Sequence, residues 1–382
     1  MGGKIWKRCV PLVLTAALLW NLGGTALALD DVPAPSAVLM EAGTGRVLYE
    51  KNAHEQRPCA SITKVMTLLL VMEALDAGKI KLEDQVAASA HAASMGGSDI
   101  WLKEGEVMTV DDLLKATVIM SANDAAVVLA EYVAGSEEDF VSQMDQRAAQ
   151  LGMEDTVFKN CNGLDEDGHV TSAYDVALMS RALIAHEKIF DYSQVWMDSV
   201  RNGETQLVNT NKLLKTYDGI TGLKTGTTGK AGSCISATAE RDGLSLIGVV
   251  LGASSTKDRF DAAAKLLDYG FANWACVELP MPSLPSVAVE NGVTDQVAVT
   301  AETEGPISVL VPKGQAEQVE TAVSLPESIR APVEEGQRLG EVVFRLGEDT
   351  LAQVPLYASE GMEALSLGGC FWELLRSLCA FV

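Results

Sequence analysis

The spacing of apolar residues divides the chain into stretches of different period. Residues 36–40 and 47–49 alternate as β-strands do, and the glycine-containing stretch 42–45 between them has the composition of a turn. This pattern predicts a hairpin of edge strands. Residues 61–77 are instead apolar on nearly every side and stop at Gly78, which predicts a helix buried in the core.

Further helices are predicted through the middle of the chain. A Ser or Thr followed three residues later by an acidic residue is typical of a helix start, and this spacing occurs at 109–112, 136–139 and 172–175. The apolar spacing predicts helices over residues 109–120, 122–133 and 176–185, with another after residue 136.

From residue 220 the period returns to that of strands. Residues 222–227 are short and β-like, and residues 234–239 and 244–251 flank the turn Arg241-Asp242-Gly243. A last helix is expected over 258–274. Strands from both ends thus enclose a helical middle, which predicts one α+β domain of residues 29–275.

Three prolines, Pro280, Pro282 and Pro285, mark a boundary. Beyond them the pattern is one of short alternating strands, at residues 287–289, 297–300, 307–311, 319–325 and 341–346. Residues 276–362 are therefore expected to form a small all-β module. This part has no catalytic constellation, and a spacer or docking role is expected for it.

The first 28 residues have the pattern of a secretory signal peptide. Lys4, Lys7 and Arg8 form a basic start, an apolar run covers residues 9–20, and small residues at 26 and 28 resemble a cleavage site. The alternative is an uncleaved membrane anchor, although the run is short for a span of about 20 residues. The pattern predicts export.

The last residues, 363–382, are expected to form an amphipathic helix. Phe371, Leu374, Leu375, Leu378 and Val382 fall on one helical face. Such a helix can lie in a membrane surface, which would hold the exported protein on the outer face of the cytoplasmic membrane. The alternative is a helix packed on the β module.

The composition indicates a globular protein and excludes a nucleic-acid role. The chain has 382 residues, of which 48% are hydrophobic, and its net charge is −23. Without the three basic residues of the predicted signal peptide, the chain has 26 basic and 52 acidic residues, a net charge near −26. Such a surface repels nucleic acid.

The seven cysteines are scattered without a C-x-x-C pair, and there are four histidines. Neither a metal site nor another cofactor is expected, and Cys59 and Cys234 are interpreted as small buried thiols. His169 lies in an acid-rich loop, 165–169, which we interpret as a capped loop rather than a metal site.

Three short segments carry the candidate chemistry: Ser61-Ile62-Thr63-Lys64, Ser121-Ala122-Asn123 and Lys224-Thr225-Gly226. Each is common alone, but together and in this order they supply the groups of a serine acyl-transfer enzyme that works without histidine. Metal chemistry is not needed for such a reaction.

Ser61 and Lys64 are three residues apart at a helix start, so they share a face. A neutral lysine can remove the serine proton if desolvation and nearby positive charge lower its pKa. The alternative is a helix-capping Ser beside a solvated Lys. The apolar neighbours Ala60, Ile62 and Val65 favour the catalytic interpretation.

The other two segments are expected to form the walls of a cleft. Ser121, between two helices, could relay a proton to a leaving amine, and Asn123 could bind Lys64 and a substrate amide; the alternative is a plain linking turn. Lys224 is expected on an edge strand where a peptide can dock, with Gly226 allowing close approach. The alternative is an ordinary exposed edge lysine.

With these residues in hand, the chain resembles the low-molecular-mass penicillin-binding proteins, which are serine D-Ala-D-Ala carboxypeptidases. The resemblance covers nearly the whole chain. Further residues that carry it are Asn162-Gly163-Leu164-Asp165, Gly168-His169, Ser172-Ala173-Tyr174-Asp175, Ala231-Gly232 and Arg259. It implies a serine β-lactamase/transpeptidase-like domain, an antiparallel sheet with a helical subdomain, followed by the small all-β domain.

The resemblance also implies roles for the site residues. Ser61 would attack the penultimate D-alanine of a peptidoglycan stem peptide with Lys64 as base, while Ser121 relays the proton and Asn123 and Lys224 hold the network. The N–H groups of Ser61 and Thr227 would form the oxyanion hole. Thr225 and Arg259 would bind the terminal carboxylate, and β-lactam inhibitors would acylate Ser61.

Three rival functions are considered. A class A β-lactamase would need a deacylating glutamate in an E-x-x-L-N pattern, which the chain lacks. A D,D-endopeptidase that cuts peptidoglycan cross-links would use the same three segments. A non-catalytic receptor for β-lactams or wall peptides should have lost some of them, and this chain has all three.

Overall fold

The computed structural model describes residues 29, 32–303, 305–366, 368–369 and 371. The predicted signal peptide and most of the predicted C-terminal helix lie outside these residues. Within them, no helix is both long and apolar enough to cross a bilayer.

A five-stranded antiparallel sheet forms the centre of the first domain, in the order β2-β1-β9-β8-β7. The strands are β1 (Ser36–Glu41), β2 (Val47–Lys51), β7 (Ile220–Thr228), β8 (Gly232–Arg241) and β9 (Leu244–Ala253). The pairing of β1 with β9 joins the two ends of the domain, so of the hairpin predicted to consist of edge strands only β2 lies at an edge. β7 lies at the edge of the sheet, so the prediction of an edge strand is confirmed.

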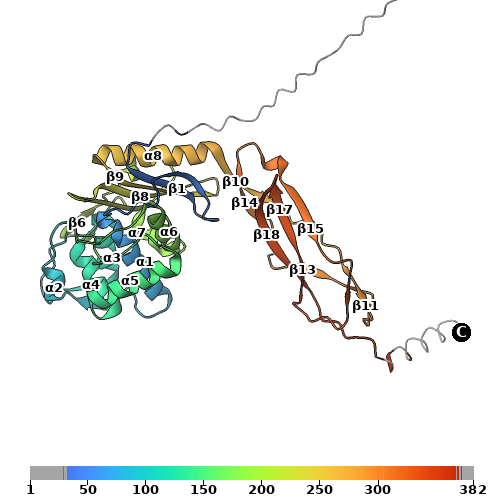
Figure 1. The fold of residues 1–382 in the computed structure, drawn as a ribbon. Helices are drawn as coiled ribbons and strands as arrows, with labels where there is room; N and C mark the ends of the chain where they lie inside the picture. The colour runs from blue at the N-terminus through green and yellow to red at the C-terminus, as the bar shows by residue number, and fades with distance from the viewer. Residues whose placement is uncertain (1–28, 30–31, 304, 367, 370, 372–382) are drawn as a thin grey trace, which may run out of the picture.

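Helices cover both faces of this sheet (Figure 1). On one face α8 (Thr256–Asn273) packs on a core that includes Leu39, Leu246 and Leu266. The other face carries a helical subdomain with a second, larger core. Its helices are α1 (Lys64–Asp76), α2 (Ala90–Ala93), α3 (Val110–Lys115), α4 (Asn123–Ala134), α5 (Glu137–Leu151), α6 (Ala173–Ile184) and α7 (Phe190–Ser193). Two short hairpins flank them: β3 (Gln85–Ala87) with β4 (Val107–Thr109), and β5 (Met197–Val200) with β6 (Thr205–Val208).

The predicted helix starts are confirmed by their capping contacts. The side chains of Thr109, Ser136 and Ser172 each accept a hydrogen bond from the backbone N–H three residues later. Two helices differ from expectation. The predicted helix 61–77 begins with a 3₁₀ turn, Ala60–Thr63, before α1, and the predicted helix 109–120 ends in a π turn, Ala116–Met120.

The C-terminal module is all β. The ribbon of β10 (Trp274–Leu279) with β14 (Ile307–Pro312) follows α8 directly, so the predicted boundary after residue 275 falls inside β10. Two sheets complete the module, in the orders β12-β11-β16 and β13-β18-β17-β15. Their strands are β11 (Val287–Glu290), β12 (Gln296–Val297), β13 (Val299–Ala301), β15 (Glu320–Ser324), β16 (Ser328–Arg330), β17 (Arg338–Leu346) and β18 (Asp349–Ala358).

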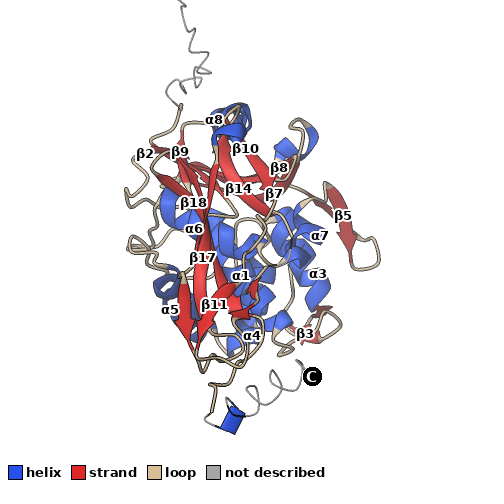
Figure 2. Cartoon of the chain, turned by 90° about the vertical axis from the view of Figure 1, so that its right-hand side faces the viewer, coloured by secondary structure: helices blue, strands red, loops and turns tan. Residues whose placement is uncertain are grey.

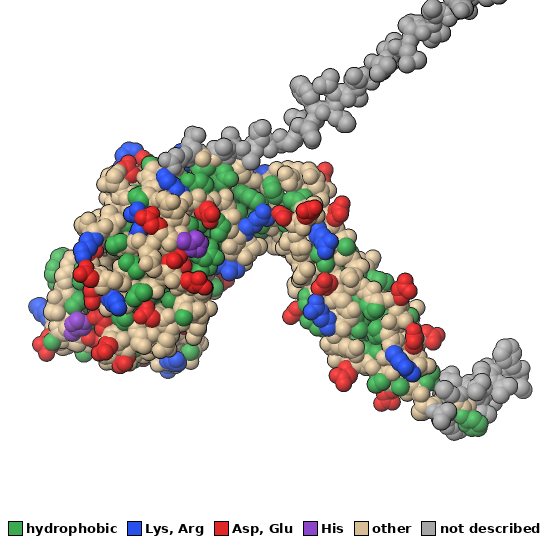
Figure 3. Space-filling model, in the orientation of Figure 1, with side chains coloured by type: hydrophobic (Ala, Val, Ile, Leu, Met, Phe, Trp, Pro, Cys, Tyr) green, Lys and Arg blue, Asp and Glu red, His purple; other side chains and the backbone are tan. Residues whose placement is uncertain are grey.

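The two parts of the molecule are distinct bodies. The module extends away from the α8 end of the first domain in Figure 1, and its strands lie in front of the helical layer in Figure 2. Acidic side chains are scattered over both bodies on the face seen in Figure 3, in keeping with the net charge of −23. No strand of the module pairs with the five-stranded sheet among the described residues.

Candidate active site

Ser61 and Lys64 meet where the chain enters α1. The 3₁₀ turn holds Ser61, and Ala60 beside it has a left-handed backbone with φ of 52°. Lys64 is the first residue of α1, and its Nζ lies 3.0 Å from Ser61 Oγ. The sequence-predicted pair is therefore in hydrogen-bond contact.

Lys64 is fully buried and bonded only to neutral oxygens. Its Nζ donates to Asn123 Oδ1 at 2.5 Å and to the carbonyl of Asn162 at 2.6 Å. Burial lowers the pKa of Lys64 from 10.5 to about 7, because the charged form loses its hydration. Burial alone lowers this pKa, although nearby positive charge was also expected from the sequence to lower it.

Asn123 is held in one orientation by the loop after α2. Its backbone N–H donates to the carbonyl of Ser98 and its side-chain Nδ2 to the carbonyl of Gly96, each at 2.6 Å. The amide oxygen therefore faces Lys64. Ser121, two residues earlier, is buried and has a left-handed backbone with φ of 66° at the end of the π turn. Among the described residues its hydroxyl forms no hydrogen bond with either of the site lysines.

Lys224 and Thr225 lie on β7 and are both buried, so the interpretation of Lys224 as an exposed edge lysine is wrong. Lys224 Nζ donates to the carbonyl of Thr225 at 3.0 Å, and Thr225 Oγ1 donates to Thr210 Oγ1 at 2.7 Å. Burial, with the charges of Lys64 and Arg259, lowers the pKa of Lys224 well below its usual value. Lys224 therefore contributes less positive charge than its residue type suggests.

Gly226 allows a close approach, but to the protein's own chain. A Cβ atom at this position would lie 2.8 Å from both the Cys59 carbonyl oxygen and the Ser61 nitrogen. No side chain fits there, so β7 can pack directly on the turn that carries the nucleophile. The glycine of the third segment thus brings the first and third segments together.

Arg259 reaches the same strand from the first turn of α8. Its Nη1 donates to the Gly226 carbonyl at 3.0 Å and to Thr227 Oγ1 at 2.9 Å. The side chain is buried, and its Nε has no hydrogen-bond partner among the described residues. Arg259 therefore supports the β7 backbone directly at the position predicted to bind the substrate carboxylate.

The sequence analysis assigned no role to Asn162, Gly163 or His169. The Asn162 carbonyl accepts from Lys64, and a Cβ on Gly163 would lie 2.0 Å from the Ala60 carbonyl oxygen. This segment therefore also packs directly against the nucleophile turn. The Asn-Gly pair was the available signal, since Gly163 has a left-handed φ of 85°.

His169 is a structural support of the nucleophile turn. Its Nδ1 accepts from the Lys159 N–H at 3.0 Å, which leaves Nε2 as the donor to Thr63 Oγ1 at 2.7 Å. Burial lowers the pKa of His169 to about 4, so the ring is neutral at pH 7. Within the described residues, no group of His, Cys, Asp and Glu is arranged to hold a metal ion.

Cys59 and Cys234 are buried free thiols, as predicted. Burial raises the pKa of Cys59 to about 12 and that of Cys234 to about 11, so both stay protonated and unreactive at neutral pH. They fill space behind the turn and β8.

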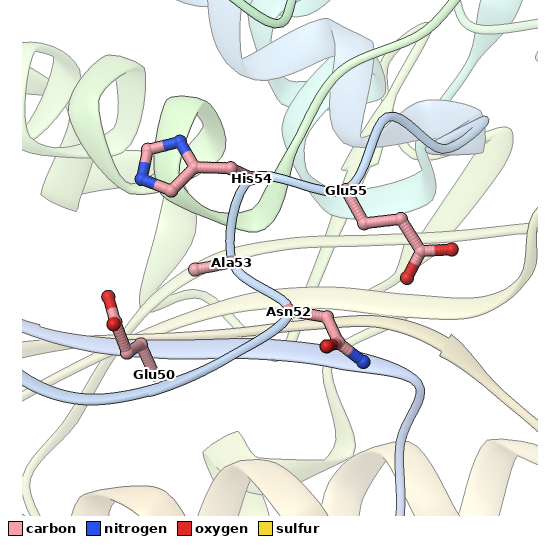
Figure 4. Close-up of a pocket in the computed structure, with 5 residues that line it drawn as sticks. All are labelled: Glu50, Asn52, Ala53, His54 and Glu55. Carbon is pink, nitrogen blue, oxygen red and sulfur yellow. The ribbon is translucent and has the colours of Figure 1, made fainter.

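A separate surface pocket is lined by one stretch of chain, Glu50 and residues 52–55 (Figure 4). The side chain of His54 in it is paired with Asp155 at 2.9 Å. None of the predicted site residues lines this pocket. The catalytic groups converge instead between β7, the start of α1 and the loop before α4.

Comparison with known proteins identifies the family. The D-alanyl-D-alanine carboxypeptidase family matches residues 24–255, more than half of the chain. The chain belongs to this family. A second match, to the C-terminal domain of penicillin-binding protein 5, covers residues 283–364 and accounts for the all-β module.

Relatives of this carboxypeptidase family cover nearly the whole chain. D-alanyl-D-alanine carboxypeptidase DacF of Bacillus subtilis is 42% identical over 94% of this chain and 95% of its own length. DacC of Escherichia coli is 35% identical over 95% of this chain and 94% of its own length.

Solved structures confirm the predicted fold class. Penicillin-binding protein 5 of Haemophilus influenzae matches with a TM-score of 0.78 and 28% identity, covering 88% of this chain and 99% of its own. Penicillin-binding protein D2 of Listeria monocytogenes, in its ampicillin-bound form, matches with a TM-score of 0.58 and 34% identity. It covers 63% of this chain and 98% of its own.

Proposed function

We propose that this protein is a serine D,D-carboxypeptidase that removes the terminal D-alanine from peptidoglycan stem pentapeptides through an acyl-enzyme on Ser61. The observation that carries the proposal is a buried Lys64 with a pKa of about 7, whose Nζ lies 3.0 Å from Ser61 Oγ. Membership of the D-alanyl-D-alanine carboxypeptidase family supports the substrate class.

In the first step neutral Lys64 takes the Ser61 proton as Oγ attacks the carbonyl carbon of the penultimate D-alanine. The N–H groups of Ser61 and Thr227 stabilise the oxyanion. Gly226 supports this arrangement, because its missing Cβ brings β7 onto the Ser61 nitrogen.

The amide bond then breaks as its nitrogen receives a proton and leaves with the terminal D-alanine. Ser121 relays this proton from Lys64, while Asn123 and Lys224 hold the network. Ser121 is buried two residues before Asn123, and the bound substrate would complete the relay. Water afterwards hydrolyses the Ser61 ester and regenerates the enzyme.

Thr225 and Arg259 bind the carboxylate of the departing D-alanine. Arg259 supports this role because it stays protonated at all working pH values. β-Lactams, which imitate D-alanyl-D-alanine, acylate Ser61 in place of substrate; the ampicillin-bound relative from Listeria supports this expectation.

The test is mass spectrometry of D-alanine release from a stem pentapeptide, with Ser61→Ala as the inactive control. Release by the wild-type protein alone is the expected result. If a C-terminally amidated peptide were cleaved as fast as the free acid, the D,D-endopeptidase alternative would be favoured. Penicillin binding without turnover of any wall peptide would favour the receptor alternative.

We also propose that the protein is exported and held on the outer face of the cytoplasmic membrane by residues 363–382. The basic and apolar start of the chain and the apolar stripe of the last residues support this proposal. Phe371, the one residue of the stripe that the structure describes, is 61% exposed.

Membrane fractionation of a truncated protein tests the anchor. Truncation after Ser366 keeps Met362, which is buried and bridges to Val333, and removes the whole stripe. The truncated protein should be soluble and retain peptidase activity. Leu374→Glu should release the full chain, whereas Ala380→Glu on the opposite face should not. Sedimentation of the truncated protein with membranes would contradict the anchor.

A further inference from the structure

The loop between α2 and β4 carries the most exposed large apolar side chain of the described residues. Trp101 is 72% exposed, while its neighbours Ile100 and Leu102 are buried. An isolated exposed apolar residue is ordinary in itself. Here, however, the backbone of Trp101 is left-handed, with φ of 55°, a conformation that bulky residues adopt only when their surroundings impose it.

The surroundings hold the backbone on both sides of Trp101. The buried carboxylate of Asp124 accepts from the N–H of Ile100 at 3.1 Å and from that of Leu102 at 3.0 Å. From the β5–β6 hairpin, Arg201 Nη1 donates to the Ile100 carbonyl at 2.8 Å. The indole therefore stands on a rigid base and projects into solvent.

The same loop is bonded to the catalytic centre. Its Gly96 and Ser98 carbonyls accept from Asn123, whose amide oxygen in turn accepts from Lys64. Asp124, whose carboxylate accepts the hydrogen bonds from Ile100 and Leu102, is the residue after Asn123. Trp101 is therefore fixed relative to the catalytic lysine through a short chain of hydrogen bonds.

The position of this loop indicates which part of the substrate it meets. In the proposed function, Arg259 and β7 take the terminal carboxylate, so the leaving D-alanine lies at that end of the site. Asn123 was expected from the sequence to bind a substrate amide, and it lies at the start of α4 rather than on β7. A loop bonded to Asn123 therefore flanks the portion of the peptide upstream of D-alanyl-D-alanine.

We propose that Trp101 is a binding platform for the stem-peptide residues that precede D-alanyl-D-alanine, and so determines specificity for extended substrates. This inference rests on the proposed function. An indole offers a large rigid apolar face and an N–H donor at a low cost in conformational entropy, which suits the side chain of an extended peptide. In this placement Trp101 would touch neither the scissile bond nor the terminal carboxylate, so it acts on specificity and not on the chemistry.

The experiment compares two substrates, N-acetyl-D-alanyl-D-alanine and a stem pentapeptide, by D-alanine release. Trp101→Ala should lower kcat/KM for the pentapeptide about tenfold, mainly through KM, and change that for the short substrate less than about twofold. Trp101→Phe should retain most of the preference for the pentapeptide. The rate of penicillin acylation should be unchanged in both variants.

Val293→Ala is the matched control, because Val293 is also highly exposed, at 62%, but lies in the C-terminal module. It should change neither substrate. Equal losses on both substrates in Trp101→Ala, or no loss on either, would overturn the inference. Wild-type protein that releases D-alanine from neither substrate would instead overturn the proposed function, and the inference with it.

Discussion

The pH dependence of Ser61 acylation follows directly from the burial of Lys64. A pKa of about 7 leaves roughly half of the side chains neutral at pH 7, a tenth at pH 6 and nine-tenths at pH 8. A lysine at the ordinary value of 10.5 would be neutral in only about one molecule in 3,000 at pH 7. The structure thus supplies about a thousandfold more of the reactive form.

The direction in which the acylation rate changes with pH follows from which form of Lys64 acts as the base. The neutral form is active, so acylation should rise as pH increases through 7, by about tenfold between pH 6 and pH 8, and then level off. The assay is stopped-flow acylation with a fluorescent penicillin at saturating and subsaturating concentrations from pH 5.5 to 9. A rate that is flat across pH 6–8, or that climbs only above pH 9, would refute the reasoning.

Lys64→Arg separates charge from basicity at the same position. Arginine keeps the charge but does not deprotonate at working pH, so acylation should fall by at least about a thousandfold and lose its rise with pH. Lys79→Arg, at an exposed lysine, is the control and should reproduce the wild-type profile. Near-normal acylation by the Lys64→Arg variant would show that Lys64 is not the base.

Two further predictions concern β7. Gly226→Ala places a Cβ 2.8 Å from the Cys59 carbonyl oxygen and should slow acylation at least about a hundredfold. The control is Gly229→Ala, whose Cβ would have no atom within 4 Å and should not slow acylation. Comparable rates for the two variants in a penicillin-labelling assay would show that the contact is unimportant. Arg259→Ala should lower kcat/KM at least about tenfold for a free-acid peptide but much less for an amidated one, as D-alanine or D-alanine amide release will show. Equal losses on the two peptides would assign Arg259 to strand support alone.

The sequence predicted most of the elements because their signals are local. Capping residues such as Ser136 and Ser172, and the buried pattern of α1, act within a few residues of the chain. The strand β18 was missed because Pro355 and polar residues interrupt its alternation, and its stability comes from pairing with β13 and β17.

The candidate site was predicted in its residue types but not in its contacts. The first two segments meet at Lys64 and the third packs on the turn that holds Ser61, which the spacing alone could not show beyond the first pair. The carbonyl of Asn162, the second acceptor for Lys64, carries no side-chain signal, because any residue supplies a carbonyl. Gly226 was expected to approach substrate, yet the atoms it faces belong to the turn at Ser61, and only the three-dimensional packing reveals them.

The site combines a lysine that can lose its proton with an arginine that stays protonated. Burial lowers the pKa of Lys64 to about 7, so it can lose its proton near the working pH, as proton transfer requires; burial also lowers the pKa of Lys224 well below its usual value. A site for a carboxylate still needs a permanent cation in a protein of net charge −23, and Arg259 is suited to supply it because a guanidinium stays protonated. Its contact with the Gly226 carbonyl and Thr227 ties that charge to the strand that closes on Ser61. The same strand thus links the carboxylate end of the substrate to the nucleophile, which explains why substrate selection and acylation should respond together when β7 is disturbed.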